Sequence, residues 1–231
     1  MKKEKITAIV LAAGQGKRMG GKTAKQYLPL DGRPLLYYTL LAFEKSVVDE
    51  MILVTGENDL SFCRTEIVER YGFTKVTQIV AGGKERYHSV YQGLMSAVGA
   101  DYVLIHDGAR PFVTDDIISR TIETVRKEKA CAVAMPVKDT IKIVNKDHYA
   151  IQTPNRSDVW MMQTPQAFSY DLILHAYEKV LAFEDSTITD DAMVLEKAEN
   201  VPVKLVEGSY TNIKITTPED MKIAEIFLKD S

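Results

Sequence analysis

The sequence predicts an α/β fold in which helices cover both faces of a mostly parallel sheet. Short β-branched or aliphatic runs alternate with stretches of helical length, and turn residues separate them. We expect strands at Ile6–Leu11, Met51–Thr55, Lys75–Val80, Tyr102–Ile105 and Ala130–Pro136, and helices at Pro34–Lys45, Leu60–Tyr71, Glu85–Val98 and Thr114–Lys127. This alternation favours right-handed βαβ units of Rossmann-like type, which bind ligands outside the carboxyl ends of their strands.

The rhythm changes between Val137 and Met162. Two short alternating stretches, Thr140–Val144 and Tyr149–Thr153, flank the turn residues Asn145–His148. We expect a β-hairpin arm at about 137–158. It is too small for a domain of its own, so it either folds onto the sheet or reaches a partner chain.

The last element predicted from the sequence is a C-terminal helix. Thr217 supplies an N-cap and Pro218 stands at the first helical position, followed by acidic residues in the first turn. The helix should run through Leu228 and turn Met221, Ala224 and Leu228 inward. Nearby, Ile213-Lys214-Ile215 alternates like a strand.

Composition is typical of a globular protein. Of the 231 residues, 45% are hydrophobic and 26% charged, and no repeat, low-complexity tract or linker marks a boundary. We therefore expect a single domain over residues 1–231. Because 29 basic and 32 acidic residues give a net charge of −3, a dedicated nucleic-acid binder is not expected.

The cysteines and the N-terminus indicate a cytoplasmic protein. Cys63 and Cys131 lie far apart and form no CxxC pair, which argues against a zinc site and against a secreted disulfide framework. The apolar or small run Ile6–Ala13 is too short to span a membrane, and no signal-peptide pattern is present.

The loop after the first predicted strand has the composition of an anion site. Between Leu11 and Lys25 it contains small residues and glycines, which let backbone N–H groups approach a phosphate closely. Four cations follow within nine residues: Lys17, Arg18, Lys22 and Lys25. Local positive charge in an otherwise near-neutral protein predicts phosphate binding here.

Two better-known phosphate motifs fit this loop less well. The dinucleotide fingerprint GxGxxG begins at Gly14 and Gly16, but Met19 replaces the third glycine. Gly16–Thr23 satisfies GxxxxGK[ST], yet the strand ends about four residues early and Pro29 stops any long helix. A P-loop NTPase and a non-catalytic nucleotide-binding module remain remote alternatives.

The residues carry a resemblance that spans essentially the whole chain. The sequence is similar to 2-C-methyl-D-erythritol 4-phosphate cytidylyltransferases, enzymes of the non-mevalonate isoprenoid pathway. Eight ordered blocks match: Leu11–Gly14 through Arg18-Met19, Lys25–Tyr27, Gly82–Arg86 with Ser89-Val90, His106–Pro111, Asp139-Thr140, Gln163–Gln166, Thr189-Asp190 and Asn212–Lys214. The resemblance implies CTP and 2-C-methyl-D-erythritol 4-phosphate as substrates.

A related branch, the ribitol 5-phosphate cytidylyltransferases, shares the first loop and the late Asn-Ile-Lys. That branch tends to read Leu-Ala-Gly-Gly, Asp-Arg-Asn and Ser-Val where this chain has Ala13, Glu85–Tyr87 and Gly108-Ala109. These differences favour the methylerythritol acceptor, and ribitol 5-phosphate is the alternative.

The resemblance also implies roles for individual residues in the nucleotide site. Nucleotidyl transfer needs charge neutralisation at the α-phosphate and no protein nucleophile. Arg18, Lys25 and Lys214 are expected to be the catalytic cations. CTP is expected to contact mostly backbone groups, of Ala12, Ala13, Gly14, Gly16, Gly82 and Gly83, with the Ser89 hydroxyl and Asp107.

Metal and acceptor binding are assigned in the same way. Asp107 emerges from an apolar strand and is expected to bind Mg²⁺ or another divalent cation, whereas His106 is interpreted as structural. The polyol phosphate acceptor is expected to meet hydroxyl and guanidinium groups, of Arg110, Thr140, Arg156, Thr164 and Thr189. In the family the arm interlocks with a second subunit, so the resemblance implies a homodimer in which Thr140 and Arg156 serve the partner's site.

Overall fold

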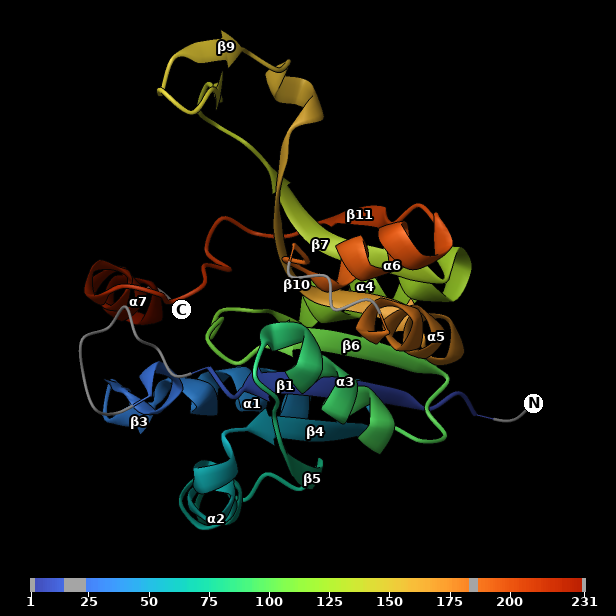
Figure 1. Cartoon of the computed structure of the whole chain (residues 1–231). Coiled ribbons are helices and arrows are strands. Elements are labelled where there is room, and N and C mark those ends of the chain that lie inside the picture. Colours follow the sequence, from blue (N-terminus) through green and yellow to red (C-terminus); the bar gives the residue numbers. More distant parts are fainter. Residues whose placement is uncertain (1–2, 15–23, 183–186, 230–231) are drawn as a thin grey trace.

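A seven-stranded sheet forms the centre of the computed structural model, which describes residues 3–14, 24–182 and 187–229 (Figure 1). Its strands follow the order β11 (Lys204–Glu207), β7 (Ala130–Pro136), β10 (Trp160–Ser169), β6 (Tyr102–Asp107), β1 (Ile6–Ala12), β4 (Glu50–Thr55) and β5 (Val76–Ala81). All neighbours pair in parallel except β10, which runs antiparallel to both β6 and β7. The predicted α/β architecture is therefore confirmed.

Successive side chains of the central strand enter opposite cores. Ala8 and Val10 pack into one hydrophobic cluster and Ile9 packs into the other, as the two-residue period of a strand requires. The first cluster is completed by α1 (Leu35–Lys45), η4 (Cys63–Glu69) and α4 (Asp115–Glu128), whereas α2 (Leu60–Phe62), which precedes η4, has no buried residue. The second contains α3 (Arg86–Ser96), α5 (Tyr170–Leu181) and α6 (Asp191–Glu199).

The predicted strands and helices differ from the observed ones mainly at their ends. The helix expected over Leu60–Tyr71 is present over that length, but its middle is a π-helix: after η3 (Glu57–Asp59), α2 forms the first turn and η4 continues as a π-helix. Ile213–Ile215 is not a strand, and Ile215 N–H instead donates to the Ala109 carbonyl at 2.8 Å. The sequence reasoning did not identify β10, α5, α6 or β11.

The C-terminal helix α7 (Pro218–Lys229) confirms its predicted start and its buried face. Thr217 Oγ1 accepts from Asp220 N–H at 3.3 Å, and Ala224 is fully buried. Met221 and Leu228 are partly buried in a third cluster with Leu30 of β2 (Pro29–Leu30), which pairs with β3 (Arg33–Pro34). Within the described ranges, no helix combines the length and the apolar character that crossing a bilayer requires.

The predicted hairpin is present and projects away from the sheet (Figure 1). Its paired segments β8 (Ile143–Val144) and β9 (Ala150–Gln152) are shorter than expected, and η5 (Arg156–Asp158) leads back to β10. Every residue of β8 and β9 is exposed, including the large apolar side chains of Ile143, Val144 and Ile151. The arm therefore carries apolar surface that its own chain does not cover.

Candidate active site at the carboxyl edge of the sheet

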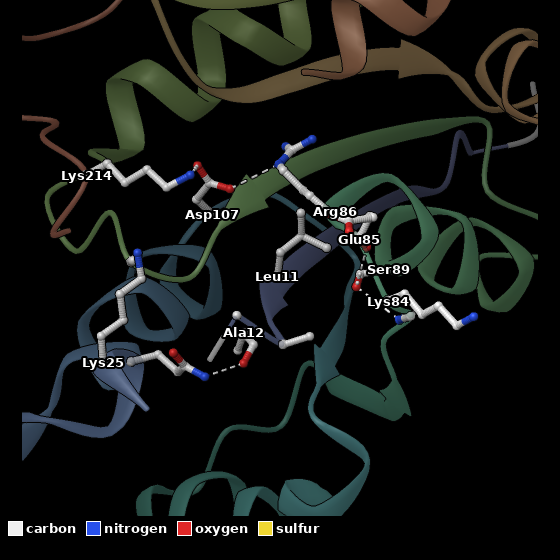
Figure 2. Close-up of a pocket in the computed structure, with 14 residues that line it drawn as sticks. Leu11, Ala12, Lys25, Lys84, Glu85, Arg86, Ser89, Asp107 and Lys214 are labelled. Atoms are coloured by element: carbon white, nitrogen blue, oxygen red, sulfur yellow. Dashed lines mark hydrogen bonds and ion pairs between the residues drawn. The ribbon is translucent and has the colours of Figure 1, made fainter. Parts of the chain in front are cut away.

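A pocket of about 520 Å³ opens at the edge where the sequence predicts the ligand (Figure 2). It lies between the loop after β1, the loop between β5 and α3, the last residue of β6, and segments from η2 (Lys25–Tyr27) and the C-terminal region. Its lining consists of Leu11, Ala12, Ala13, Gly14, Lys25, Gln26, Gly83, Lys84, Glu85, Arg86, Ser89, Asp107, Ala109 and Lys214. Eight of the predicted site residues are thus brought together: Ala12, Ala13, Gly14, Lys25, Gly83, Ser89, Asp107 and Lys214.

The two small-residue loops contact each other directly. A Cβ atom on Gly82 would lie 2.6 Å from Ala13 Cβ and 2.7 Å from Ser89 Oγ, so only glycine fits there without a shift. Ser89 Oγ accepts from Gly83 N–H at 3.1 Å and donates to the Glu85 carbonyl at 3.2 Å. The serine hydroxyl therefore orders the second glycine loop.

The backbone position of Lys25 is fixed by the two residues that follow it in the chain. The buried amide of Gln26 donates to the Ala12 carbonyl, and Tyr27 Oη and Thr55 Oγ1 are 2.6 Å apart. These bonds fasten η2 to the ends of β1 and β4. In Figure 2 the Lys25 side chain lies on the same side of the pocket as that of Lys214.

Asp107 is the centre of a charge cluster at the end of β6. Its Oδ2 lies 2.8 Å from Lys214 Nζ and 3.7 Å from Arg110 Nε, while its Oδ1 lies 3.5 Å from Arg86 Nε. Burial alone would raise the pKa of Asp107, but the three cations hold it well below its usual range. The pocket lining carries four basic side chains, Lys25, Lys84, Arg86 and Lys214, against the two carboxylates of Glu85 and Asp107, so the wall is positive and suits a polyanion.

Behind Asp107, His106 links two predicted acceptor residues. Thr164 Oγ1 accepts from Asp107 N–H at 3.1 Å and lies 3.0 Å from His106 Nδ1, and His106 Nε2 lies 3.3 Å from the Arg110 carbonyl. Burial lowers the pKa of His106 to about 4, so the imidazole is neutral. The Thr164 hydroxyl then donates to Nδ1 and Nε2–H donates to Arg110, which agrees with a structural histidine.

Other predicted residues lie outside the pocket or outside the described chain. Thr189 is exposed just before α6, whereas Thr140 and Arg156 are exposed in the arm, where Arg156 Nη1 donates to the Lys138 carbonyl at 3.1 Å. Arg18 and Gly16 fall outside the residues that the structure describes. Gly82 adjoins the pocket without lining it.

Sequence reasoning gave no role to several residues that build this site. They are Leu11, Gln26, Lys84, Glu85, Arg86, Ala109 and the buried Asn212. The side-chain Nδ2 of Asn212 donates to the Thr164 carbonyl at 3.0 Å. The backbone carbonyl of Asn212 accepts from Arg110 Nη1 at 2.8 Å. All seven stand inside blocks of the resemblance, which was the available signal.

The described residues contradict the P-loop alternative and give the metal one candidate ligand. Beyond Ala24 the chain forms the three-residue η2 and then the β2–β3 pair, where a P-loop needs a long helix. In the described ranges no group of three or more His, Cys, Asp or Glu side chains could hold a metal ion. Asp107 is ionised at the pocket wall and suits Mg²⁺ held mostly by phosphate oxygens and water.

Comparison with known proteins identifies the family. The sequence profile of 2-C-methyl-D-erythritol 4-phosphate cytidylyltransferase matches residues 6–230. Proteins of that name from Lachnoclostridium phytofermentans and Lachnospira eligens are 49% and 52% identical over 227 residues each, covering 98% and 96% of this chain and 97% and 99% of theirs.

A crystal structure of 4-diphosphocytidyl-2C-methyl-D-erythritol synthase from Anaerococcus prevotii superposes with a TM-score of 0.86 at 39% identity, covering 98% of this chain and 96% of that one. These relatives favour the methylerythritol assignment over the ribitol alternative, because their names specify that acceptor or its product. The chain belongs to the 2-C-methyl-D-erythritol 4-phosphate cytidylyltransferase family.

Proposed function

We propose that this enzyme transfers the cytidylyl group of CTP to 2-C-methyl-D-erythritol 4-phosphate. The observation that carries the proposal is the pocket in which Lys25, Lys214 and Asp107 meet two small-residue loops, in a chain of this family. An oxygen of the acceptor phosphate attacks the α-phosphorus of CTP as the bond to the β-phosphate oxygen breaks. The products are 4-diphosphocytidyl-2-C-methyl-D-erythritol and pyrophosphate.

Catalysis in this proposal is positioning and charge neutralisation. Lys25, Lys214 and Arg18 contact the phosphates and stabilise the charge that develops on the α-phosphate oxygens. The backbone of residues 12–14, Gly16, Gly82 and Gly83 binds the base and the ribose. The Ser89 hydroxyl keeps the second loop in the conformation that this binding needs. The acceptor phosphate is already ionised near neutral pH, so no general base is needed.

The acceptor is proposed to bind beside Asp107. Thr164 and Arg110 are linked to each other there through His106, and Thr189, which stands just before α6, would complete the acceptor site. Guanidinium and hydroxyl groups of these types suit a phosphate and a polyol.

A divalent cation, Mg²⁺ in this proposal, would be held by Asp107 together with substrate phosphates. When bound, it supplies additional charge neutralisation on those phosphates. Lys214 Nζ, now 2.8 Å from Asp107 Oδ2, must then share or leave that carboxylate, and the phosphates offer it a new anionic partner.

We also propose that the chain is one domain and works as a homodimer through the arm at 137–158. The exposed apolar side chains of Ile143, Val144 and Ile151 support an interface there. Thr140 and Arg156 would complete the partner's acceptor site, which explains their distance from the pocket of their own chain.

The test is pyrophosphate release from CTP and Mg²⁺ with each acceptor in parallel. We expect turnover with 2-C-methyl-D-erythritol 4-phosphate and at least about a hundredfold lower kcat/KM with ribitol 5-phosphate. Preferential turnover of ribitol 5-phosphate would overturn the acceptor assignment while leaving the CTP site in place. CTP binding with no release from either acceptor would favour a binding module.

A further inference from the structure

Arg86, the first residue of α3, is bonded to carboxylates on two other elements. Its Nη1 and Nη2 donate to Asp191 Oδ1 and Oδ2 at 2.8 and 2.7 Å, which is the fork geometry that only arginine provides. Its Nε lies 3.5 Å from Asp107 Oδ1, the contact drawn as a dashed line in Figure 2. Arg86 therefore connects the pocket to α6.

Asp191 is a fully buried carboxylate at the start of α6. Besides Arg86 it accepts from Tyr177 Oη at 2.6 Å, and its backbone N–H donates to Gln166 Oε1 at 3.0 Å. The same Gln166 oxygen accepts from Ala192 N–H at 2.9 Å, and Asp190 caps the helix through Met193 N–H. These bonds fix the beginning of α6 against β10, α5 and α3.

The bonds between Arg86 and Asp191 lie between two parts of the proposed active site. Thr189, a predicted acceptor residue, stands two residues before Asp191, and Asp107 contacts the Nε atom of the same Arg86 guanidinium. The Gly82–Glu85 loop leads directly into Arg86. The Arg86 side chain thus joins the Asp107 carboxylate to the segment that carries Thr189, whereas the nucleotide loop before it is held by Ser89.

Arg86 lines the pocket, but direct phosphate binding is the weaker interpretation. Three of its nitrogen atoms already contact carboxylates, and moving the guanidinium to a ligand would leave the Asp191 charge buried without its cation. An uncompensated buried charge is costly, whereas the bonded arrangement satisfies both groups. The geometry suits a group that acts through its neighbours.

We propose that Arg86 is a positioning residue that holds the segment 189–191 at a fixed place relative to Asp107, and so sets the geometry of the polyol phosphate site. This inference rests on the proposed function for its kinetic consequences. The structural part of the inference, that Arg86 immobilises residues 189–191, can be tested without measuring activity.

The first test is steady-state kinetics of Arg86→Lys, which keeps the charge and removes the fork. We expect the acceptor kcat/KM to fall on the order of tenfold to a hundredfold, with a raised acceptor KM, because small misplacements are costly in transfer reactions. The KM for CTP should stay within about twofold. Arg120→Lys is the matched control, since Arg120 also pairs with a first-turn helix carboxylate, Asp116 at 2.9 Å, but on the surface.

The second test is hydrogen exchange and needs no turnover. The amides of Asp191 and Ala192 donate to Gln166 and report on the start of α6. In Arg86→Lys we expect these amides to exchange about tenfold faster or more, while amides of β1 and β4 keep their wild-type rates. Arg120→Lys should leave all of these rates unchanged.

A milder variant tests the same inference if Arg86→Lys fails to fold. Tyr177→Phe removes the 2.6 Å bond to Asp191 and keeps both charges. It should raise the acceptor KM alone, by about two- to fivefold.

Distinct outcomes separate this inference from the proposed function. An equal rise of both KM values, or a loss of kcat that follows the fraction of folded enzyme, would overturn the positioning role. So would unchanged exchange at Asp191 and Ala192 in Arg86→Lys. Wild-type enzyme that releases no pyrophosphate with the methylerythritol acceptor would defeat the proposed function, and the exchange result would still decide this inference.

Discussion

Lys25 illustrates how neighbouring residues give one side chain its place. Gln26 and Tyr27 anchor η2 to β1 and β4, so the ammonium group enters the pocket from a fixed backbone. We expect Lys25→Ala to lower kcat about a hundredfold to a thousandfold, because a preorganised cation at the reacting phosphate is lost. Pyrophosphate release measures this. Lys22→Ala should be far milder, and the reverse order of severity would contradict the catalytic role of Lys25.

Close contacts around Gly82 explain why this position holds a glycine. Any Cβ there meets Ala13 and Ser89 inside ordinary contact distance, so Gly82→Ala must push the two nucleotide loops apart. We expect the KM for CTP to rise about tenfold, measured with saturating acceptor. Urea unfolding of Gly82→Ala is the stability control, because a loss of folded enzyme lowers the measured kcat and leaves the KM for CTP unchanged. An unchanged KM for CTP in Gly82→Ala would remove the nucleotide role of this contact.

At the scale of one element, α7 depends on the Asp220 carboxylate. Asp220 Oδ2 accepts from the backbone N–H groups of Thr216 and Thr217 at 2.7 and 2.8 Å. Partial burial would raise the pKa of Asp220, but these bonds lower it below its ordinary value. Since the folded-state pKa is the lower one, this stabilisation is present at neutral pH and is lost as the pH falls below about 4.

Asp220→Ala should therefore destabilise the protein by about 1 kcal/mol at pH 7, as loss of a terminal cap does. Urea unfolding of both proteins at pH 7 and at pH 3 would measure this. The difference between them should shrink at pH 3, because Asp220 in the unfolded wild-type chain is then mostly protonated and folding with an ionised carboxylate requires release of that proton. A difference that stays constant with pH would contradict this role.

The element scale also shows where sequence patterns stop being informative. The parallel strands β1, β4, β5, β6 and β7 were predicted because β-branched runs bounded by turn residues are local signals. β10 was missed because Pro165 argues against a central strand. In the structure the ladder between β10 and β7 shifts register between Met162 and Gln166, so Pro165 falls in the irregularity. That irregular stretch contains Thr164, which bonds Asp107 N–H.

For the molecule as a whole, the edge of the sheet that carries the site could be predicted, but the connections between loops could not. Leu11–Gly14 and Asp107 stand at the carboxyl ends of parallel strands, and such ends meet at one edge of the sheet. By contrast, the pairing of Arg86 with Asp191 joins residues 105 positions apart and depends on how α3 and α6 pack. No local pattern encodes that contact.

The proposed dimer makes a prediction that belongs to the whole assembly. If Arg156 completes the partner's site, a heterodimer of one Lys25→Ala chain and one Arg156→Ala chain keeps a single intact site. It pairs the wild-type pocket of the second chain with the wild-type arm of the first. Tandem-tagged heterodimers should therefore recover about half of wild-type turnover, although each homodimer is nearly inactive.

A control pair separates shared sites from unspecific rescue. A heterodimer of Lys25→Ala and Lys214→Ala carries one lesion in each pocket, because both lysines line the pocket of their own chain. It should stay nearly inactive whether or not the arms are exchanged. Failure of the Lys25→Ala and Arg156→Ala pair to recover turnover, with dimers shown by sedimentation, would place Arg156 outside the partner's site. Recovery in that pair alone would mean that each active site is assembled from two chains.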